Sequence, residues 1–265
     1  MSSVVERAHV VMLAASTSSP KLTDAGDYIF RLSPVSIGLG DILALKARKD
    51  GIERIAVIHE ETDYATPAAE RLRDQFVRLG GKVTVFTSFA PGETDFRAIA
   101  TRVKSQNPDA LYLGVQAQDT AILLVRQVRE LGLNVQLLGN EVTGSAVVQF
   151  VGDKTIFDGL IFAEPEFHPE LSPTKEFISR FESTFRTQGL PFGIWTAEAY
   201  DTVDLLAKTI AQCGDDAELV KACLYKVRNY DGVSGRVSIN EKGDGVRQYV
   251  VKSVKDGRIV EPHES

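Results

Sequence analysis

The chain has 265 residues, of which 43% are hydrophobic and 25% are charged; its net charge is −6 and its pI is about 5.4. A chain of this length is too long for a domain with one small core, and it fits one large α/β domain or two lobes of a soluble protein. Acidic and basic residues are interleaved with no Lys/Arg cluster, which argues against a nucleic-acid partner, and no apolar run is long enough to span a bilayer.

The N-terminal sequence MSSVVERAHVVMLAAS does not follow the pattern of a signal peptide. Glu6, Arg7 and His9 interrupt its apolar residues, whereas a signal peptide carries a basic segment followed by an unbroken apolar stretch. We therefore expect the end of a helix that runs into a strand, and a cytoplasmic location if Met1 is the true start.

Short β-rich runs alternate with amphipathic helical periods up to about residue 165. The predicted strands are His9–Ala14, Tyr28–Arg31, Arg54–His59, Lys82–Phe86, Ala110–Val115, Val135–Leu138 and Gly159–Phe162. The predicted helices are Leu39–Arg48, Pro67–Leu79, Phe96–Ser105, Thr120–Leu131 and Gly144–Val151. Strands separated by helices of this length predict βαβ units, and apolar runs such as ALYLGV are typical of parallel strands buried on both faces.

The pattern changes after residue 165. Three longer helices are predicted, followed by a glycine-rich β section with a turn at residues 240–244: Thr174–Arg186, Trp195–Cys213, Ala217–Tyr225, then strands Gly235–Ile239 and Arg247–Lys252. We expect Trp195 and Tyr200, which share one helix with Leu205, to belong to the core. Cys213 and Cys223 lie ten residues apart, and we expect buried free thiols there, although a disulfide is the alternative.

Ligands of open parallel sheets bind beyond the carboxyl ends of the strands, so the residues after each strand are the candidate site. They include Ser16, Thr17 and Ser18, then Tyr64, Gln116 and Glu141. Ser19 is expected to cap a short helix that begins at Pro20, and free N–H groups and hydroxyls there suit a carboxylate or a phosphate. Glu141 suits an ammonium group. Three alternatives remain: the serine loop is capped but binds no ligand, Glu141 is a solvated acid, and Tyr64 is a surface residue.

Other chemistry is not indicated. Gly38-Leu39-Gly40 lacks the third glycine of a dinucleotide fingerprint, and the chain contains no GxSxG motif. Glu164, Glu166 and His168 could suggest a metal site, but Pro165 and Pro169 make this an extended segment with solvated side chains. We therefore expect neither an enzyme nor a cofactor.

Several stretches together resemble the leucine/isoleucine/valine-binding type of periplasmic binding protein. They are ASTSSPKLT (15–23), GDYIFRLSP (26–34), RIAVIHEETDYATPAAERLRDQFVRLGGKV (54–83), PGETDFRAIATRVKSQNPDALYLG (91–114), LVRQVRELGLNVQLLGNE (124–141) and YDGVSGRVSINEKGD (230–244). The resemblance covers essentially the whole chain, and it implies a type I periplasmic-binding fold of two doubly wound parallel-sheet lobes.

The resemblance also implies roles for individual residues. Ser16, Thr17 and Ser18 would hold the α-carboxylate of a ligand, Tyr64 would form a wall of the pocket, and Glu141 would bind the ammonium group. A second tyrosine of the family falls near Gln116, where this chain has no aromatic residue, so the pocket is expected to be more polar or roomier.

On this basis lobe I comprises residues 1–35 and 166–249, and lobe II comprises 36–165 and 250–265. Compared with the family, the chain begins in the helix before ASTSSP, so lobe I is expected to be incomplete. The implied protein is a monomeric receptor in the periplasm that delivers an amino-acid-like solute, bound in the cleft between the lobes, to a membrane ABC permease.

Two other interpretations remain open. The chain could be a ligand-sensing regulatory domain of the same fold, in which case a DNA-binding or signalling module should precede it in the reading frame. It could also bind an aromatic or aliphatic carboxylic acid in place of an amino acid.

Overall fold

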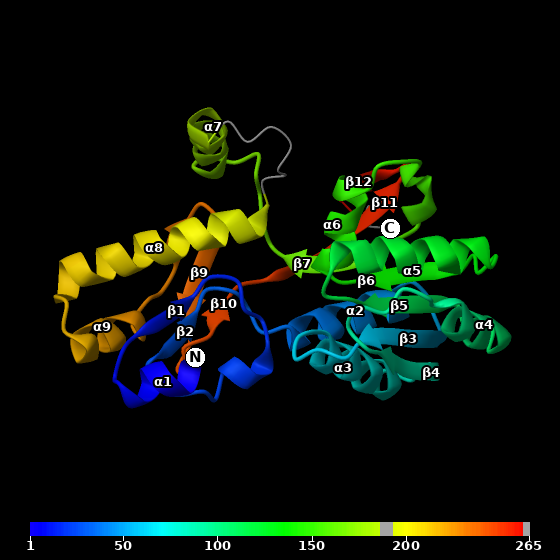
Figure 1. The fold of residues 1–265 in the computed structure, drawn as a ribbon, viewed down its shortest axis with the longest axis horizontal. Helices are drawn as coiled ribbons and strands as arrows, with labels where there is room; N and C mark the ends of the chain where they lie inside the picture. The colour runs from blue at the N-terminus through cyan, green and yellow to red at the C-terminus, as the bar shows by residue number, and fades with distance from the viewer. Residues whose placement is uncertain (186–192, 262–265) are drawn as a thin grey trace. The chain divides into compact units, whose positions relative to one another are not determined.

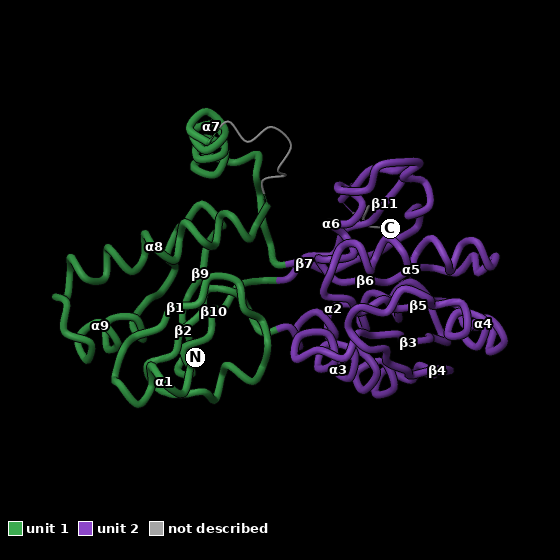
Figure 2. Tube along the Cα trace, viewed as in Figure 1, with its two compact units in different colours: residues 1–35, 165–248 green, residues 36–164, 249–265 purple. Residues whose placement is uncertain are grey.

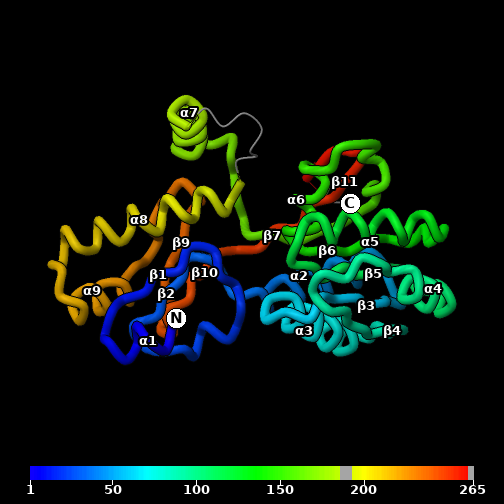
Figure 3. Tube along the Cα trace, viewed as in Figure 1, coloured from blue at the N-terminus to red at the C-terminus, as the bar shows by residue number. Residues whose placement is uncertain are grey.

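The computed structural model describes residues 1–185 and 193–261 (Figure 1). The chain divides into two compact units: unit 1 contains residues 1–35 and 165–248, and unit 2 contains residues 36–164 and 249–265 (Figure 2). The chain therefore passes from one unit to the other three times. Each unit combines an early and a late part of the sequence, as the colours along the tube in Figure 3 show.

Unit 2 is built on a seven-stranded sheet with the order β12-β11-β7-β6-β5-β3-β4. Its strands are β3 (Arg54–Glu60), β4 (Lys82–Phe89), β5 (Ala110–Gly114), β6 (Gln136–Gly139), β7 (Ile161–Pro165), β11 (Tyr249–Lys255) and β12 (Arg258–Val260). The strands β3 to β7 pair in parallel, whereas β11 and β12 form an antiparallel pair. The prediction of a parallel sheet from βαβ units is confirmed.

Helices cover both faces of this sheet because its central strands are apolar on both sides. On β3, Ile55 and Val57 pack with α2 (Ile37–Lys49) and α3 (Ala65–Arg78). Ala56 and Ile58 point to the other face, where they pack with α4 (Arg97–Ser105), α5 (Gln118–Glu130) and α6 (Glu141–Gln149). A short 3₁₀ helix, η2 (Lys154–Phe157), precedes β7.

Unit 1 contains two small sheets and its own helices. The elements are α1 (Ser2–Arg7), β1 (Met12–Ala14), η1 (Pro20–Leu22), β2 (Ile29–Arg31), α7 (Thr174–Phe185), α8 (Ile194–Cys213), α9 (Ala217–Leu224), β8 (Tyr230–Gly232), β9 (Gly235–Ile239) and β10 (Gly245–Val246). β1 and β2 pair in parallel, and β8, β9 and β10 are antiparallel. Phe30 and Leu32 of the β2 region pack with Leu205 of α8 and Val237 of β9, so the core joins both parts of the sequence.

The prediction that Trp195 and Tyr200 lie in the core is wrong. Their exposed fractions are 37% and 42%. The buried face of α8 instead carries Ala197, Glu198, Asp201, Leu205 and Thr209. Because Glu198 and Asp201 lie on the buried face, the spacing of apolar residues does not show which face of α8 is buried. Arg186, the predicted last residue of the preceding helix, lies outside the described residues.

The expectation of free thiols is also wrong, because Cys213 and Cys223 form a disulfide. Cys213 is the last residue of α8, and Cys223 lies in the last turn of α9. The turn between the two antiparallel helices brings the Cα atoms to 6.7 Å, within the range that a disulfide spans. Among the described helices, none is long and apolar enough to cross a membrane.

Candidate functional site

The strand order of unit 2 identifies one edge of its sheet as the place for a ligand. β3 lies between β4 and β5, so the connections that follow β3 and β5 lead away in opposite directions along the sheet. In doubly wound sheets a crevice forms at this switch point, beyond the carboxyl ends of the strands. Tyr64 follows β3, Gln116 follows β5, and Glu141 follows β6 with one residue between them.

Glu141 occupies the first position of α6 and is 7% exposed. We expected it in a loop, with the helix beginning at Gly144. The helix begins earlier because the Asn140 side chain caps it, accepting a hydrogen bond from the N–H of Thr143 at 3.1 Å. Asn140 is itself held by a bond to the Val115 carbonyl at 2.6 Å. The helix terminus therefore places a carboxylate in a buried position where the helix dipole favours its charge.

Two tyrosines lie around this carboxylate. Burial raises the pKa of the Tyr64 phenol well above its ordinary value, and the charge of Glu141 adds to the shift. The pKa of Tyr112, on β5, is raised by the same two causes in the same order. Both phenols therefore remain neutral at physiological pH. The structure brings Tyr64 and Glu141 together, as the candidate site requires.

Gln116 is exposed, and its main chain is held by Glu60, which was not among the predicted site residues. The N–H of Gln116 donates to the carboxylate of Glu60 at 2.7 Å. Glu60 is the last residue of β3 and is 5% exposed. A single acidic residue at a strand end carries no sequence signal for this contact, since its partner lies on a different loop.

The serine-rich loop lies in unit 1. Ser16 and Thr17 are exposed, whereas Ser18 is partly buried. The prediction of a short helix at Pro20 is confirmed by η1, with the Ser19 hydroxyl accepting from the N–H of Lys21.

The buried guanidinium of Arg31 anchors this loop. It donates to the carbonyls of Thr17 at 3.2 Å and Ser19 at 2.6 Å, and it pairs with Asp244 at 2.5 Å. Because the carbonyls of Thr17 and Ser19 are bonded to the buried Arg31, these bonds fix the conformation of the loop.

A second buried acid of unit 1, Glu198, lies under the same loop. It accepts a hydrogen bond from the hydroxyl of Ser33 at 2.8 Å and faces Arg247 at 3.5 Å. The Ser33 hydroxyl also lies 3.0 Å from the carbonyl of Ala15. Burial raises the pKa of the Glu198 carboxyl, although Arg247 and the hydroxyls of Ser33 and Ser16 oppose the shift. No sequence pattern predicted this contact.

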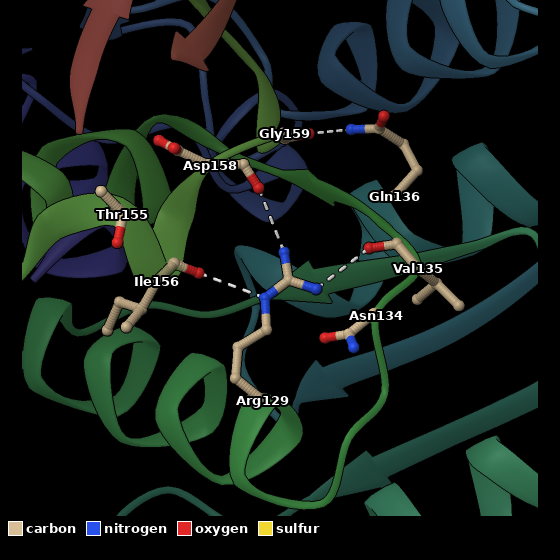
Figure 4. A pocket seen from close by; sticks show the side chains of 8 residues that line it. All are labelled: Arg129, Asn134, Val135, Gln136, Thr155, Ile156, Asp158 and Gly159. Atoms are coloured by element: carbon tan, nitrogen blue, oxygen red, sulfur yellow. Dashed lines mark hydrogen bonds between the residues drawn. The ribbon is translucent and has the colours of Figure 1, made fainter. Parts of the chain in front are cut away.

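A pocket of about 510 Å³ lies at the opposite end of β6 from Glu141. Figure 4 shows its central Arg129, whose guanidinium donates to the carbonyls of Ile156, Val135 and Asp158 at 3.2–3.3 Å. Because these bonds occupy the guanidinium, we assign Arg129 a structural role. In the described part of the chain, no group of three or more His, Cys, Asp or Glu residues could hold a metal ion.

A family model described as periplasmic binding protein matches residues 1–258. The chain belongs to this family. It is 28% identical over 249 residues to the leucine-, isoleucine-, valine-, threonine- and alanine-binding protein of Pseudomonas aeruginosa, a match that covers 91% of the chain and 64% of that protein. It is 25% identical to the Leu/Ile/Val-binding protein of Escherichia coli K12, covering 92% and 65%. The chain thus spans slightly less than two thirds of these curated relatives.

Solved structures have the same fold. A leucine-binding protein of Thermotoga maritima matches with a TM-score of 0.82 and 27% identity, over 98% of this chain and 74% of that one. A solute-binding protein of Rhodopseudomonas palustris BisB5, in complex with 3,4-dihydroxybenzoic acid, has a TM-score of 0.83 and 21% identity, over 97% and 71%. The second match concerns the fold alone. The expected type I periplasmic-binding fold is confirmed.

Proposed function

We propose that the chain is the solute-binding component of an ABC transporter and that its ligand is an amino acid of the branched-chain type. Glu141 carries this proposal: a carboxylate that is 7% exposed, at a helix terminus, beside tyrosines that stay neutral. The carboxylate can accept charge-assisted hydrogen bonds from the N–H donors of an α-ammonium group.

The ligand carboxylate is assigned to the loop Ser16–Ser18 of unit 1. Its hydroxyls and N–H groups match the acceptor oxygens of a carboxylate, and Arg31 holds the carbonyls of Thr17 and the adjacent Ser19. Tyr64 and Gln116 complete the proposed site. The Tyr64 ring forms an apolar wall, and Gln116 makes a polar contact with the ligand side chain. The two units serve as the two lobes of the receptor.

The names of the relatives support this proposal, since the curated matches are binding proteins for leucine, isoleucine and valine. We assign the protein to the periplasm, in partnership with a membrane permease. The disulfide between Cys213 and Cys223 supports an oxidising compartment.

Isothermal titration of the purified protein tests the proposal. L-leucine, L-isoleucine and L-valine are titrated in parallel with 4-methylpentanoate, which is leucine without its ammonium group, and with 4-hydroxybenzoate. The expected result is saturable binding of at least one amino acid and at least about tenfold weaker binding of 4-methylpentanoate. Preferential binding of 4-hydroxybenzoate would support an aromatic-acid receptor, and binding of no ligand in the panel would contradict both assignments.

A further inference from the structure

The hydroxyl of Tyr112 is a buried polar group that the described structure leaves without a hydrogen bond. The whole residue is 0% exposed, and no described residue donates to or accepts from its hydroxyl. Buried hydroxyls in folded proteins are almost always paired, since an unpaired one loses its bonds to water without replacement. This exception therefore requires an explanation.

The position of the ring indicates where the hydroxyl points. Tyr112 is the third residue of β5, and Gly114 ends the same strand. A Cβ atom at Gly114 would lie 2.8 Å from the edge of the Tyr112 ring, closer than packed atoms allow. The ring therefore lies along the strand across Gly114, toward the carboxyl edge of the sheet. Glycine at position 114 leaves the space for it.

The surroundings of the ring are otherwise apolar. Tyr112 packs in the core between the sheet and helices α2 and α3, with Leu39 and Leu72 among its neighbours. Phenylalanine would satisfy this packing equally well, so the core does not account for the hydroxyl. The charge of the Glu141 carboxylate, however, acts on the hydroxyl electrostatically.

We propose that Tyr112 is a further specificity-determining residue, whose hydroxyl receives its hydrogen-bond partner from the ammonium group of the bound ligand. An ammonium group has three N–H donors. Glu141 can accept one or two of them, and a phenolic oxygen on the neighbouring strand supplies a further acceptor. This inference rests on the proposed function and adds a group that discriminates an amino acid from the corresponding acid.

Tyr112→Phe tests the inference because it removes one oxygen and keeps the ring. We expect leucine to bind the variant at least about fivefold more weakly, while the affinity for 4-methylpentanoate changes by less than about twofold. Without a ligand, the urea midpoint of the variant should equal or exceed that of the unaltered protein, since an unpaired buried hydroxyl has been removed.

The ligand-free measurement separates this role from a structural one. A hydroxyl with a structural partner would make Tyr112→Phe less stable without ligand, and that result would overturn the inference. Tyr225→Phe is the control: its hydroxyl donates to the Asp27 carbonyl at 3.2 Å in unit 1, so the variant should lose stability and keep its affinity.

Failure of the proposed function would be recognised separately. If the unaltered protein binds no amino acid, the proposed function fails, and a lower urea midpoint for Tyr112→Phe would then overturn the inference as well. If the unaltered protein binds leucine and Tyr112→Phe binds it equally, the proposed function stands and only the role of Tyr112 is overturned.

Discussion

The carboxylate of Glu60 accepts a hydrogen bond from the main-chain N–H of Gln116 at 2.7 Å and so ties the loop after β3 to the loop after β5. The two residues are 56 positions apart in the sequence. Because these loops lie on either side of the switch point of the sheet, this one bond sets the position of Gln116 relative to the loop that carries Tyr64.

Glu60→Ala should lower the free energy of unfolding by about 1–3 kcal/mol and weaken ligand binding. The substitution leaves the N–H of Gln116 without its acceptor, and an unsatisfied group of this kind carries a cost of that size. Urea unfolding and calorimetric titration measure the two effects. The side chain of the neighbouring Glu61 accepts a hydrogen bond from the Ser88 hydroxyl on an exposed surface, so Glu61→Ala should change stability by less than about 0.5 kcal/mol. Equal effects of both variants would contradict the role of Glu60.

Glu141→Gln should weaken binding of the amino acid by about ten- to a hundredfold. A charge-assisted hydrogen bond in a buried site contributes roughly 1.5–3 kcal/mol, and the amide does not carry the charge. Binding of 4-methylpentanoate should hardly change, since it has no ammonium group. Titration of both ligands against both proteins gives the comparison. An unchanged affinity for the amino acid would exclude Glu141 from the site.

Arg31→Met should destabilise unit 1 by about 3–5 kcal/mol, because it leaves the buried carboxylate of Asp244 without its partner. It should also loosen the loop Ser16–Ser18, because the carbonyls of Thr17 and of the adjacent Ser19 lose their bonds to the guanidinium. Arg236 forms a comparable pair with Asp231, but both side chains are about two-thirds exposed. Arg236→Met should therefore change stability by less than about 1 kcal/mol, measured by thermal unfolding. Similar losses in the two variants would argue against the anchoring role.

Reduction of the disulfide should lower the free energy of unfolding by about 2–3 kcal/mol, the size typical of a short loop. Thermal unfolding with and without dithiothreitol measures the change. The double variant Cys213→Ser, Cys223→Ser should unfold at the temperature of the reduced protein and should not respond to dithiothreitol. A response of the double variant would show that the reagent acts elsewhere.

The stability contributed by Glu198 should fall as the pH rises. Burial raises the pKa of its carboxyl above the ordinary value of 4.5, so the folded protein holds this proton more tightly than the unfolded chain. Between 4.5 and the raised pKa, the folded state binds more protons, and stability decreases with increasing pH. Asp201 acts in the same direction, and Arg247 and the two serine hydroxyls oppose it.

Glu198→Gln serves as the reference for this measurement. Urea unfolding of both proteins from pH 4 to pH 7 should show the unaltered protein losing stability relative to the variant as the pH increases. Other carboxylates titrate in both proteins, and their contributions cancel in the difference. A difference that is constant or increases with pH would refute the predicted direction.

Periodicity of apolar residues predicted most of the fold because the central strands are buried on both faces. The run ALYLGV, for instance, corresponds to β5 at Ala110–Gly114. The start of α6 was missed by three residues because an Asn140 cap, and not an apolar residue, begins the helix. Position after a strand was enough to select Glu141 and Tyr64.

Contacts between distant parts of the chain could not be predicted in this way. Arg31 pairs with Asp244, and Glu198 faces Arg247 while lying under the loop near Ser16. Each of these residues, taken alone, looks like an ordinary surface charge. Their burial depends on which segments the fold brings together. Tyr112 was not predicted as a site residue, because the candidates were residues that follow a strand and Tyr112 lies inside one.

The three passages of the chain between the units also constrain the order in which the protein can fold during its synthesis. Residues 1–35 leave the ribosome before residues 165–248, so Phe30 and Leu32 cannot complete their core until Leu205 and Val237 have been made. Residues 36–164 contain parallel strands that can pair with one another as soon as they emerge. The sheet of unit 2 can therefore begin to form before the core of unit 1 is complete. Until residues 165–248 have been made, Phe30 and Leu32 lack their core partners, and exposed apolar surface of this kind is what chaperones bind.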